Sequence, residues 1–317
     1  MSVNLGQLAA TTLRNYRKTM VDNIFKENVL LNHIMANGGV EYEDGGRQIV
    51  TPLMYGENDT VMPFSGTDLL DVTPQEGIDA ATYDWKMYNV AVAFSKEDEL
   101  KNKGKSAIIK LLKKKIMQAE MSLKSRLNND LFNGAASNSK EITGLQTIMD
   151  NTSTSYGNID GTTYTWWQAY VDSDAEALTI ADIRTGRNTV NLGEGGGKCS
   201  IMVTSQTLHE KYEGLLSATI QMNPTKSKET KRLGDAGYSA LEFAGVPVVF
   251  DENCADDRWY FLNTKNLKLT IHKDANFEVV EKAEPANQHV SITHIMVMLN
   301  TTVDRRASLG MLDGKTA

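Results

Sequence analysis

The sequence predicts an α+β protein in which extended segments lie outside a compact α/β region. Three observations predict this class: an apolar stripe of helical period near the N-terminus, a long polar span framed by β-type alternation, and a long lysine-rich helix. Strands and helices alternate in the second half of the chain, and a long apolar β run lies near its end. With 317 residues, the chain is long enough for one large domain or two ordinary ones.

The first 36 residues predict a helical arm, which Asn37-Gly38-Gly39 ends because these residues tolerate a left-handed backbone. The next segment, to about residue 94, has no helical period. Arg47–Thr51 is predicted as a strand closed by Pro52, and Val90–Phe94 as a second strand. Two strands around a polar span predict a long β-hairpin arm. Because an isolated hairpin is marginal in water, we expect this arm to lie on another surface.

Ser95 is predicted to cap a helix with a possible short break near Gly104. From Gly104 to its end at Asn133-Gly134 this helix alone is about 40 Å long. Its apolar stripe is Ile108, Leu112, Ile116, Ala119, Leu123, Leu127 and Leu131. After it, Trp166-Trp167 is expected to be a hydrophobic anchor in a loop-rich region. Thr179–Asp182 matches a capping box. The strands predicted downstream are 200–204, 245–250, 258–262, 267–272 and 290–303, with a helix from residue 204 or 205 to Leu216.

Composition and charge exclude several classes of protein. The hydrophobic content of 41% and charged content of 23% are ordinary for a globular protein, and they exclude a disordered or collagen-like chain. The N-terminus lacks a signal-peptide pattern, and the longest apolar run, Ile295–Leu299, is too short to cross a membrane. We therefore expect a soluble protein made in the cytoplasm. The net charge of −7 argues against a dedicated nucleic-acid binder.

No motif in the sequence predicts catalysis, a cofactor or a metal. The glycine-rich segment 193–198 lacks the first Walker glycine, because residue 192 is leucine, and it leads from a helix to a strand. His209-Glu210 has Glu213 where a zinc protease needs its second histidine. We expect a surface helix there, and buried thiols at the two cysteines, Cys199 and Cys254.

An acidic loop beside Cys254 could bind calcium or magnesium in a metal-dependent enzyme. Its spacing does not fit an EF-hand, so we expect a solvated turn instead. Its four carboxylates are Asp251, Glu252, Asp256 and Asp257.

Charge is strongly segregated along the chain. Residues 40–85 hold ten acids and one base, a net charge of −9, whereas residues 100–126 hold nine bases and one acid, a net charge of +8. Each segment could simply be solvated. Alternatively, the arm of one subunit meets the basic helix of another, because complementary fields favour encounter and fix register. The candidate interface residues are Glu57, Asp59, Asp68, Asp71, Glu76, Lys110, Lys113, Lys114 and Lys115.

Local sequence adds a resemblance to a known family. Gly45-Gly46-Arg47 leads to Thr51-Pro52, Tyr83-Asp84-Trp85 precedes the next strand, Gly144-Leu145 follows the long helix, and Trp166-Trp167 lies in the loop region. Together with the order of elements over nearly the whole chain, these residues resemble the major capsid proteins of tailed bacteriophages, whose fold is named after phage Hong Kong 97.

The resemblance implies a division of the chain. An N-terminal arm would take residues 1–40 and an extended loop lying over a neighbouring subunit would take 41–94. The spine helix and peripheral domain would take 95–179, the axial domain 180–275, and a return to the peripheral domain 276–317. The resemblance identifies no cross-linking residues.

The resemblance also implies a structural role rather than an enzymatic one. Such subunits gather as hexamers and pentamers into an icosahedral shell around double-stranded DNA, so the expected location is the virion. The chain starts close to its arm, so a separate scaffolding protein, or prior removal of a segment, is expected, together with a portal. An encapsulin-like compartment that encloses protein cargo remains an alternative.

Overall fold

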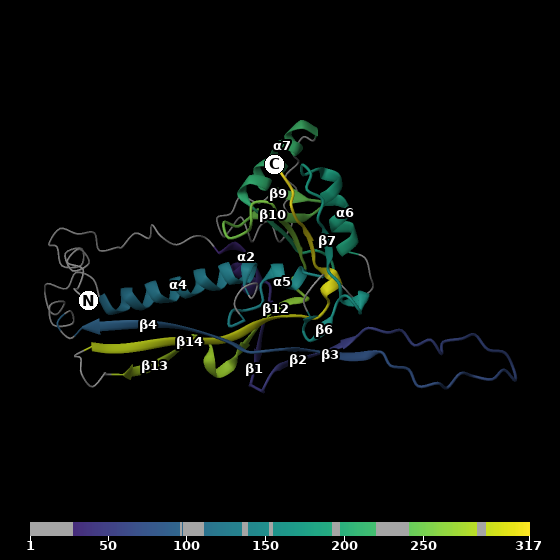
Figure 1. The fold of residues 1–317 in the computed structure, drawn as a ribbon, viewed down its shortest axis with the longest axis horizontal. Helices are drawn as coiled ribbons and strands as arrows, with labels where there is room; N and C mark the ends of the chain where they lie inside the picture. Colours follow the sequence, from purple (N-terminus) through teal and green to yellow (C-terminus); the bar gives the residue numbers. More distant parts are fainter. Residues whose placement is uncertain are drawn as a thin grey trace.

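The computed structural model describes residues 28–95, 97, 111–134, 139–151, 155–191, 197–219, 241–283 and 290–317. Figure 1 shows a body with two β-sheets and a thin arm that projects from it. The helices of the described part are α2 (Val29–Ala36), α4 (Leu111–Asn133), α5 (Leu145–Met149), α6 (Ile180–Val190) and α7 (Gln206–Thr219), with 3-10 turns at Thr165–Trp167, Lys273–Ala275 and Arg306–Ser308. None of these helices combines the length and the apolar composition that crossing a membrane would need.

The first sheet is built around one long strand, β14 (Val290–Val303), whose predicted limits are confirmed. β4 (Lys86–Ser95) runs antiparallel along one edge of β14. Its other edge pairs with β12 (Leu267–His272) and β13 (Glu278–Ala283), and β1 (Val40–Glu43) lies parallel to β12. The sheet therefore joins segments from both ends of the chain.

α4 covers one face of this sheet (Figure 1). Its 23 described residues span about 35 Å at a rise of ~1.5 Å per residue. Ala119 packs with Val92 of β4 and Ile295 of β14, and Leu123, Leu127 and Leu131 enter the main core. This part of the predicted stripe is confirmed. The helix start predicted at Ser95 leads into residues 98–110, which lie outside the described part and include Ile108.

The second sheet has six strands in the order β7-β15-β11-β8-β10-β9. Helix α6 packs against β7, β11 and β15, and α7 packs against β10. The capping box is confirmed: the Thr179 side chain accepts from the Asp182 amide, and Asp182 accepts from the Thr179 amide. The strands are β7 (Tyr170–Asp172), β8 (Ile201–Thr204), β9 (Leu241–Phe243), β10 (Val246–Phe250), β11 (Trp259–Leu262) and β15 (Gly310–Leu312).

Each of the two sheets takes strands from more than one of the ranges expected as separate domains. β7 and β15 belong to the six-stranded sheet although they lie outside the expected range 180–275, and β12 belongs to the five-stranded sheet although it lies inside. After β14 the chain crosses back and pairs β15 between β7 and β11. The reason is that sheet membership depends on pairing partners far apart in sequence, which local alternation does not identify.

The predicted hairpin is also wrong in its strands. β2 (Ile49–Met54) continues through Pro52 and pairs with β3 (Ile78–Tyr83), and the strand around Val90–Phe94 pairs with β14 instead. A two-stranded ribbon leaves an edge of each strand unpaired, and a proline is tolerated where its missing N–H would face such an edge. The β2–β3 ribbon and the arm that it carries thus lie within residues 49–83, a shorter range than the expected loop of residues 41–94.

The N-terminal prediction is confirmed where it can be compared. α2 ends as expected, with Gly38 at φ +75° and the Gly39 amide donating to the Ile34 carbonyl at 2.9 Å. Residues 1–27, which carry most of the predicted helical arm, lie outside the described part, as do residues 192–196 of the glycine-rich segment.

Candidate functional site: the extended arm

The arm is fastened to the body at its base by one apolar face of the β2–β3 ribbon. Ile49 and Leu53 of β2 and Ala81 and Tyr83 of β3 are buried, whereas the alternate residues face outward. The Tyr83 hydroxyl donates to the carbonyl of Val303, at the end of β14, at 2.9 Å. Period-two alternation therefore places one face of the ribbon on the core and leaves the other face exposed.

An aromatic stack marks the point where the arm leaves the body. The rings of Tyr55 and Trp166 lie 4.9 Å apart at an interplanar angle of 11°. Next to it, the amide of Tyr55 donates to the carbonyl of Gly77 at 2.9 Å. The backbones of Gly56 and Gly77 are so close that a Cβ on Gly77 would lie 3.0 Å from the Gly56 oxygen. Trp166 is thus part of an anchor, as predicted, and its neighbour Trp167 is buried in the main core.

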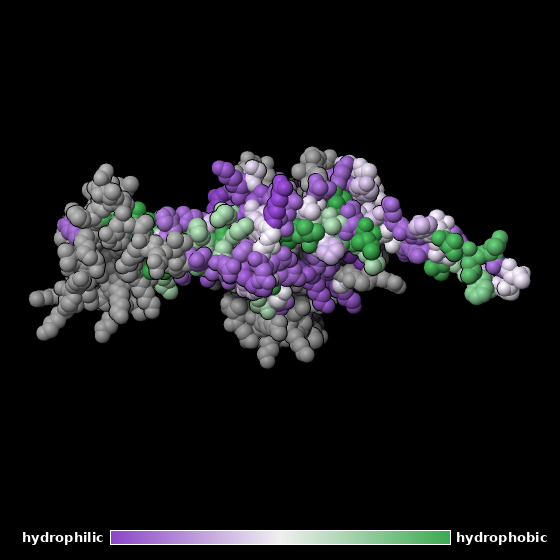
Figure 2. Space-filling model, turned by 90° about the horizontal axis from the view of Figure 1, so that it is seen from below, coloured by the Kyte–Doolittle hydropathy of each residue, from purple (hydrophilic) through white to green (hydrophobic). Residues whose placement is uncertain are grey.

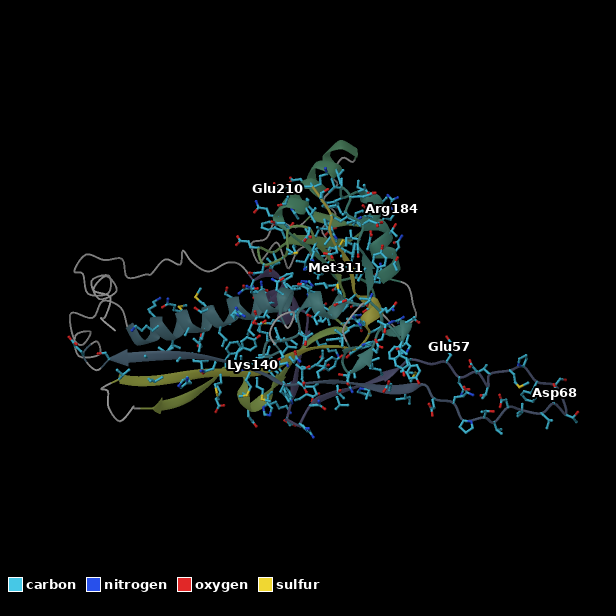
Figure 3. The ribbon with its side chains drawn as sticks, in the orientation of Figure 1. Glu57, Asp68, Lys140, Arg184, Glu210 and Met311 are labelled. Atoms are coloured by element: carbon cyan, nitrogen blue, oxygen red, sulfur yellow. The ribbon has the colours of Figure 1, made fainter. Side chains whose placement is uncertain are left out.

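Beyond this point, residues 57–76 form the distal arm, which projects alone into solvent (Figures 1 and 3). Short local bonds shape it. Asp68 accepts from the amide of Ser65 at 2.9 Å. Asp71 accepts from the hydroxyl and the amide of Thr73, and these bonds lower the pKa of the Asp71 carboxyl below its usual value. The distal arm is therefore an ordered loop with no partner strand inside the described part of the chain.

The five acidic candidates of the arm lie together on this exposed segment. Glu57 lies where the arm leaves the body and Asp68 lies at its far end (Figure 3). Every one of the five is exposed, and residues 57–76 contain no lysine or arginine: Glu57, Asp59, Asp68, Asp71 and Glu76. Two acids of the wider acidic segment are used inside the subunit, because Glu41 pairs with Lys268 at 2.6 Å and Asp44 pairs with Lys273 at 2.5 Å. Uncompensated negative charge is thus concentrated on the distal arm.

The distal arm also carries large apolar side chains, which the charge pattern of the sequence does not indicate. Leu69 is 93% exposed, Val72 87% and Val61 85%. Figure 2 shows hydrophobic residues gathered at the end of the arm. We call this set the apolar arm patch: Val61, Met62, Phe64, Leu69, Leu70 and Val72. A signal was available in the sequence, since large apolar residues such as Leu69-Leu70 stand in a polar segment without a strand or helix period.

The basic candidates lie at the opposite end of the molecule. Figure 1 places the beginning of α4 on the side of the body that faces away from the arm. Lys114 and Lys115 are half-buried in the first turns of α4, and Lys113 belongs to the same turns. Lys110 lies outside the described residues. The structure therefore does not bring the acidic and basic candidates together within one chain.

The acidic loop after β10 is a solvated turn, as predicted, at Glu252, Asp256 and Asp257, which are exposed, but Asp251 is buried. Asp251 is 1% exposed and accepts from the side-chain amide of Asn128 at 3.1 Å and from the amide of Asn253 at 2.9 Å. Its second oxygen lies 3.5 Å from the amide of Leu30. The carboxylate is thus a structural link between α2, α4 and the six-stranded sheet. No group of metal-ligating side chains occurs among the described residues.

Two further candidates for reactive chemistry are also structural. The predicted surface helix is confirmed, because Gln206 and Glu210 of α7 are exposed, but His209 is 8% exposed and its ring meets that of Phe250 edge-on at 5.4 Å. Burial lowers the pKa of the His209 imidazole and raises the pKa of the Cys254 thiol. Both groups are therefore held in their neutral forms inside the protein. Cys199 is a buried thiol as well, as predicted.

Neither family models nor curated proteins match the sequence, but solved structures match the fold along its whole length. A cyanophage A-1(L) capsid subunit has a TM-score of 0.71 at 18% identity, covering 100% of this chain and 99% of the other. The capsid protein of a native GTA particle has a TM-score of 0.64 at 10% identity, with 96% of each chain covered. A chain of Mycobacterium phage Bobi has a TM-score of 0.58 at 11% identity and covers both chains fully. The order of arm, long helix and two sheets, together with these matches, shows that the chain has the Hong Kong 97-like fold of phage capsid proteins.

Proposed function

We propose that the protein is a major capsid protein that assembles, as hexamers and pentamers of itself, into an icosahedral shell around double-stranded DNA. The observation that carries this function is the distal arm. It exposes the apolar arm patch and five acids on a thin projection that one subunit leaves uncovered. A lone projection of this kind is marginal in water, and large exposed apolar patches mark interaction sites.

The occupant of the arm would be an adjacent copy of the chain. The apolar arm patch would supply buried area, and the acids around it would guide the approach to the basic end of α4. The opposite placement of the two charged regions supports this arrangement, because each subunit could then give an arm on one side and receive one on the other (Figure 1). A head-to-tail contact of this kind forms rings where the rotation between copies closes, as pentamers and hexamers require.

Modest contacts of this kind suffice when they are repeated many times over a shell. A subunit held by its own arm and by a neighbour's arm gains through multivalency, without any contact being strong. Assembly would need a separate scaffolding protein and a portal, and the mature particle would be the virion. Nothing in the buried Asp251, His209 or Cys254 environments favours an enzymatic role, since each is used in packing.

Microscopy of the purified protein tests the proposal. We expect negative staining to show closed icosahedral particles for the wild-type chain produced together with its scaffolding protein, and unassembled subunits when residues 57–76 are replaced by a short glycine-serine turn. Circular dichroism checks that the shortened variant keeps its fold. Particles purified from an expressing host with the phage's packaging proteins should hold nuclease-protected DNA. A wild-type protein that stays monomeric in the presence of its scaffold would refute the proposal, and closed particles filled with protein would indicate a compartment shell.

A further inference from the structure

A cavity far from the arm has the character of an anion site. It has a volume of about 670 Å³ and opens at the surface. Five segments meet around it: the end of α2, the end of α6, residues 197–200 before β8, the β9–β10 turn and the β11–β12 turn. A cavity of this size suits a small molecule, since ligand sites commonly measure roughly 300–1,000 Å³.

The lining of the cavity is positively charged. Arg187, Lys198 and Lys265 contribute three cations, and the described residues of the lining include no acid. Within the described part of the chain, none of the three forms an ion pair. Three unpaired cations around one hollow stand out in a protein whose net charge is −7, and they raise the local concentration of anions.

Arg187 also has an unmet hydrogen-bond donor. Its Nε is buried and has no acceptor among the described residues. Its other nitrogens reach Asn188 Oδ1 at 3.3 Å and the Ala244 carbonyl at 3.4 Å, both long for hydrogen bonds. The guanidinium therefore has hydrogen-bonding capacity left for an oxyanion in the cavity that Arg187 lines.

Hydrogen bonds join two of the segments that line the cavity. The hydroxyls of Ser200 and Thr264 lie 3.0 Å apart, and the Thr264 amide also donates to the Ser200 hydroxyl at 3.0 Å. These bonds tie the segment before β8 to the β11–β12 turn, the two segments that carry Lys198 and Lys265. The backbone segments that carry Lys198 and Lys265 are therefore held next to each other at the cavity.

We propose that this cavity binds a phosphate-class oxyanion. Three single positive charges suit a dianion better than a carboxylate, and the planar guanidinium of arginine matches the geometry of phosphate oxygens. The phosphate could belong to a free phosphate or monoester, or to the phosphodiester of a nucleic acid. The site does not depend on the arm, so it goes beyond the proposed shell function and can fail separately from it.

Isothermal titration calorimetry on the full chain at low ionic strength tests the site. The probes are inorganic phosphate, a dinucleotide as the phosphodiester, and acetate as a carboxylate. We expect wild-type protein to bind inorganic phosphate, and Arg187→Gln to weaken that binding about ten-fold or more, as loss of a charged hydrogen bond predicts. Tighter binding of the dinucleotide than of inorganic phosphate would identify nucleic acid as the source.

Matched variants distinguish a built site from general charge. Arg184→Gln removes a cation from an exposed position of the same helix, outside the cavity, and should leave the affinity unchanged (Figure 3). Lys265→Gln, at an exposed position of the lining, should weaken binding by about three-fold and covers the case in which Arg187→Gln does not fold. The proposal is refuted if wild-type protein does not bind phosphate, if acetate binds as tightly as phosphate, or if Arg184→Gln weakens binding as much as the cavity variants.

Discussion

At the scale of single residues, buried polar groups hold the separate parts of this fold together. Asp251 ends β10 and receives hydrogen bonds from Asn128 of α4 and from its own loop. Arg306 is fully buried and donates to the carbonyls of Ile148, Asp150 and Trp167. Such groups are stable inside a protein only when their hydrogen bonds are satisfied, so each is a sensitive point.

Replacing Asp251 should destabilise the subunit strongly. In Asp251→Ala the Asn128 side chain and the Asn253 amide lose a buried acceptor, which costs on the order of 3 kcal/mol. We expect the midpoint of thermal unfolding, followed by circular dichroism on unassembled protein, to fall by about 5 °C or more. Asp256→Ala, at an exposed position of the same loop, is the control and should change it by less than about 1 °C. Equal effects of the two changes would contradict the role of Asp251 as a link.

At the scale of secondary-structure elements, the arm differs from the rest of the chain in how it is stabilised. β2 and β3 are held by their buried face and by the Tyr55–Trp166 stack, whereas the distal arm has only turns of its own. Its apolar side chains are exposed to water in the folded subunit as they are in the unfolded chain, so they add no stability to the subunit. They are therefore available for an interaction with another molecule.

A charge placed in the apolar arm patch should impair assembly and leave the subunit stable. Leu69→Asp removes a side chain that is 93% exposed, so the unfolding midpoint of the subunit should change by no more than about 1 °C. If Leu69 is buried on a neighbour, its loss costs about 2 kcal/mol for each contact, and the protein concentration needed for assembly should rise at least ten-fold.

Light scattering against protein concentration measures this effect, with Thr67→Asp as the control. Thr67 is an exposed neighbour in the arm, so this change adds the same charge but keeps Leu69. We expect a smaller effect than that of Leu69→Asp. Normal assembly of both variants would show that the apolar arm patch is not part of the interface.

At the scale of the whole molecule, the arrangement of charge follows from the shape. The negative distal arm and the basic beginning of α4 lie at opposite ends of one body (Figure 1). Attraction between them cannot stabilise the isolated subunit over that separation, because salt screens exposed charges beyond about 8–10 Å. A contact between copies is the arrangement in which the two regions could approach each other.

Reversing the basic charge should therefore change both assembly and its response to salt. We expect Lys113→Glu, Lys114→Glu and Lys115→Glu, combined in one variant, to assemble poorly at low salt and to lose the salt dependence of the wild-type protein. Lys211→Glu on α7 serves as a control away from both regions. Unchanged assembly with an unchanged salt response would remove the electrostatic explanation. Shells that form normally but enclose little DNA would assign these lysines to contacts with DNA.

Several features were predictable because they depend on residues close together in sequence. The capping box of α6, the end of α2 at Gly38 and the limits of β14 are set by hydrogen bonds and periodicity within a few residues, and the structure agrees with each. The exposed acids of the arm were also correctly placed on an extended segment. Their companions, the apolar side chains around Leu69, were overlooked because charge alone was considered.

The sequence by itself determined several of the helices and strands, among them α6 and β14, and where charge is concentrated, since these follow from local geometry and composition. The tertiary structure decided which segments meet. The alternation of Val90 and Val92 fits either a hairpin with β2 or the edge of β14, and packing of Val92 against Ile295 and α4 selects β14. Likewise, only the folded chain buries Asp251 and separates the arm from the lysines of α4. The physical reason is that pairing and burial depend on contacts between residues distant in sequence, which no local pattern specifies.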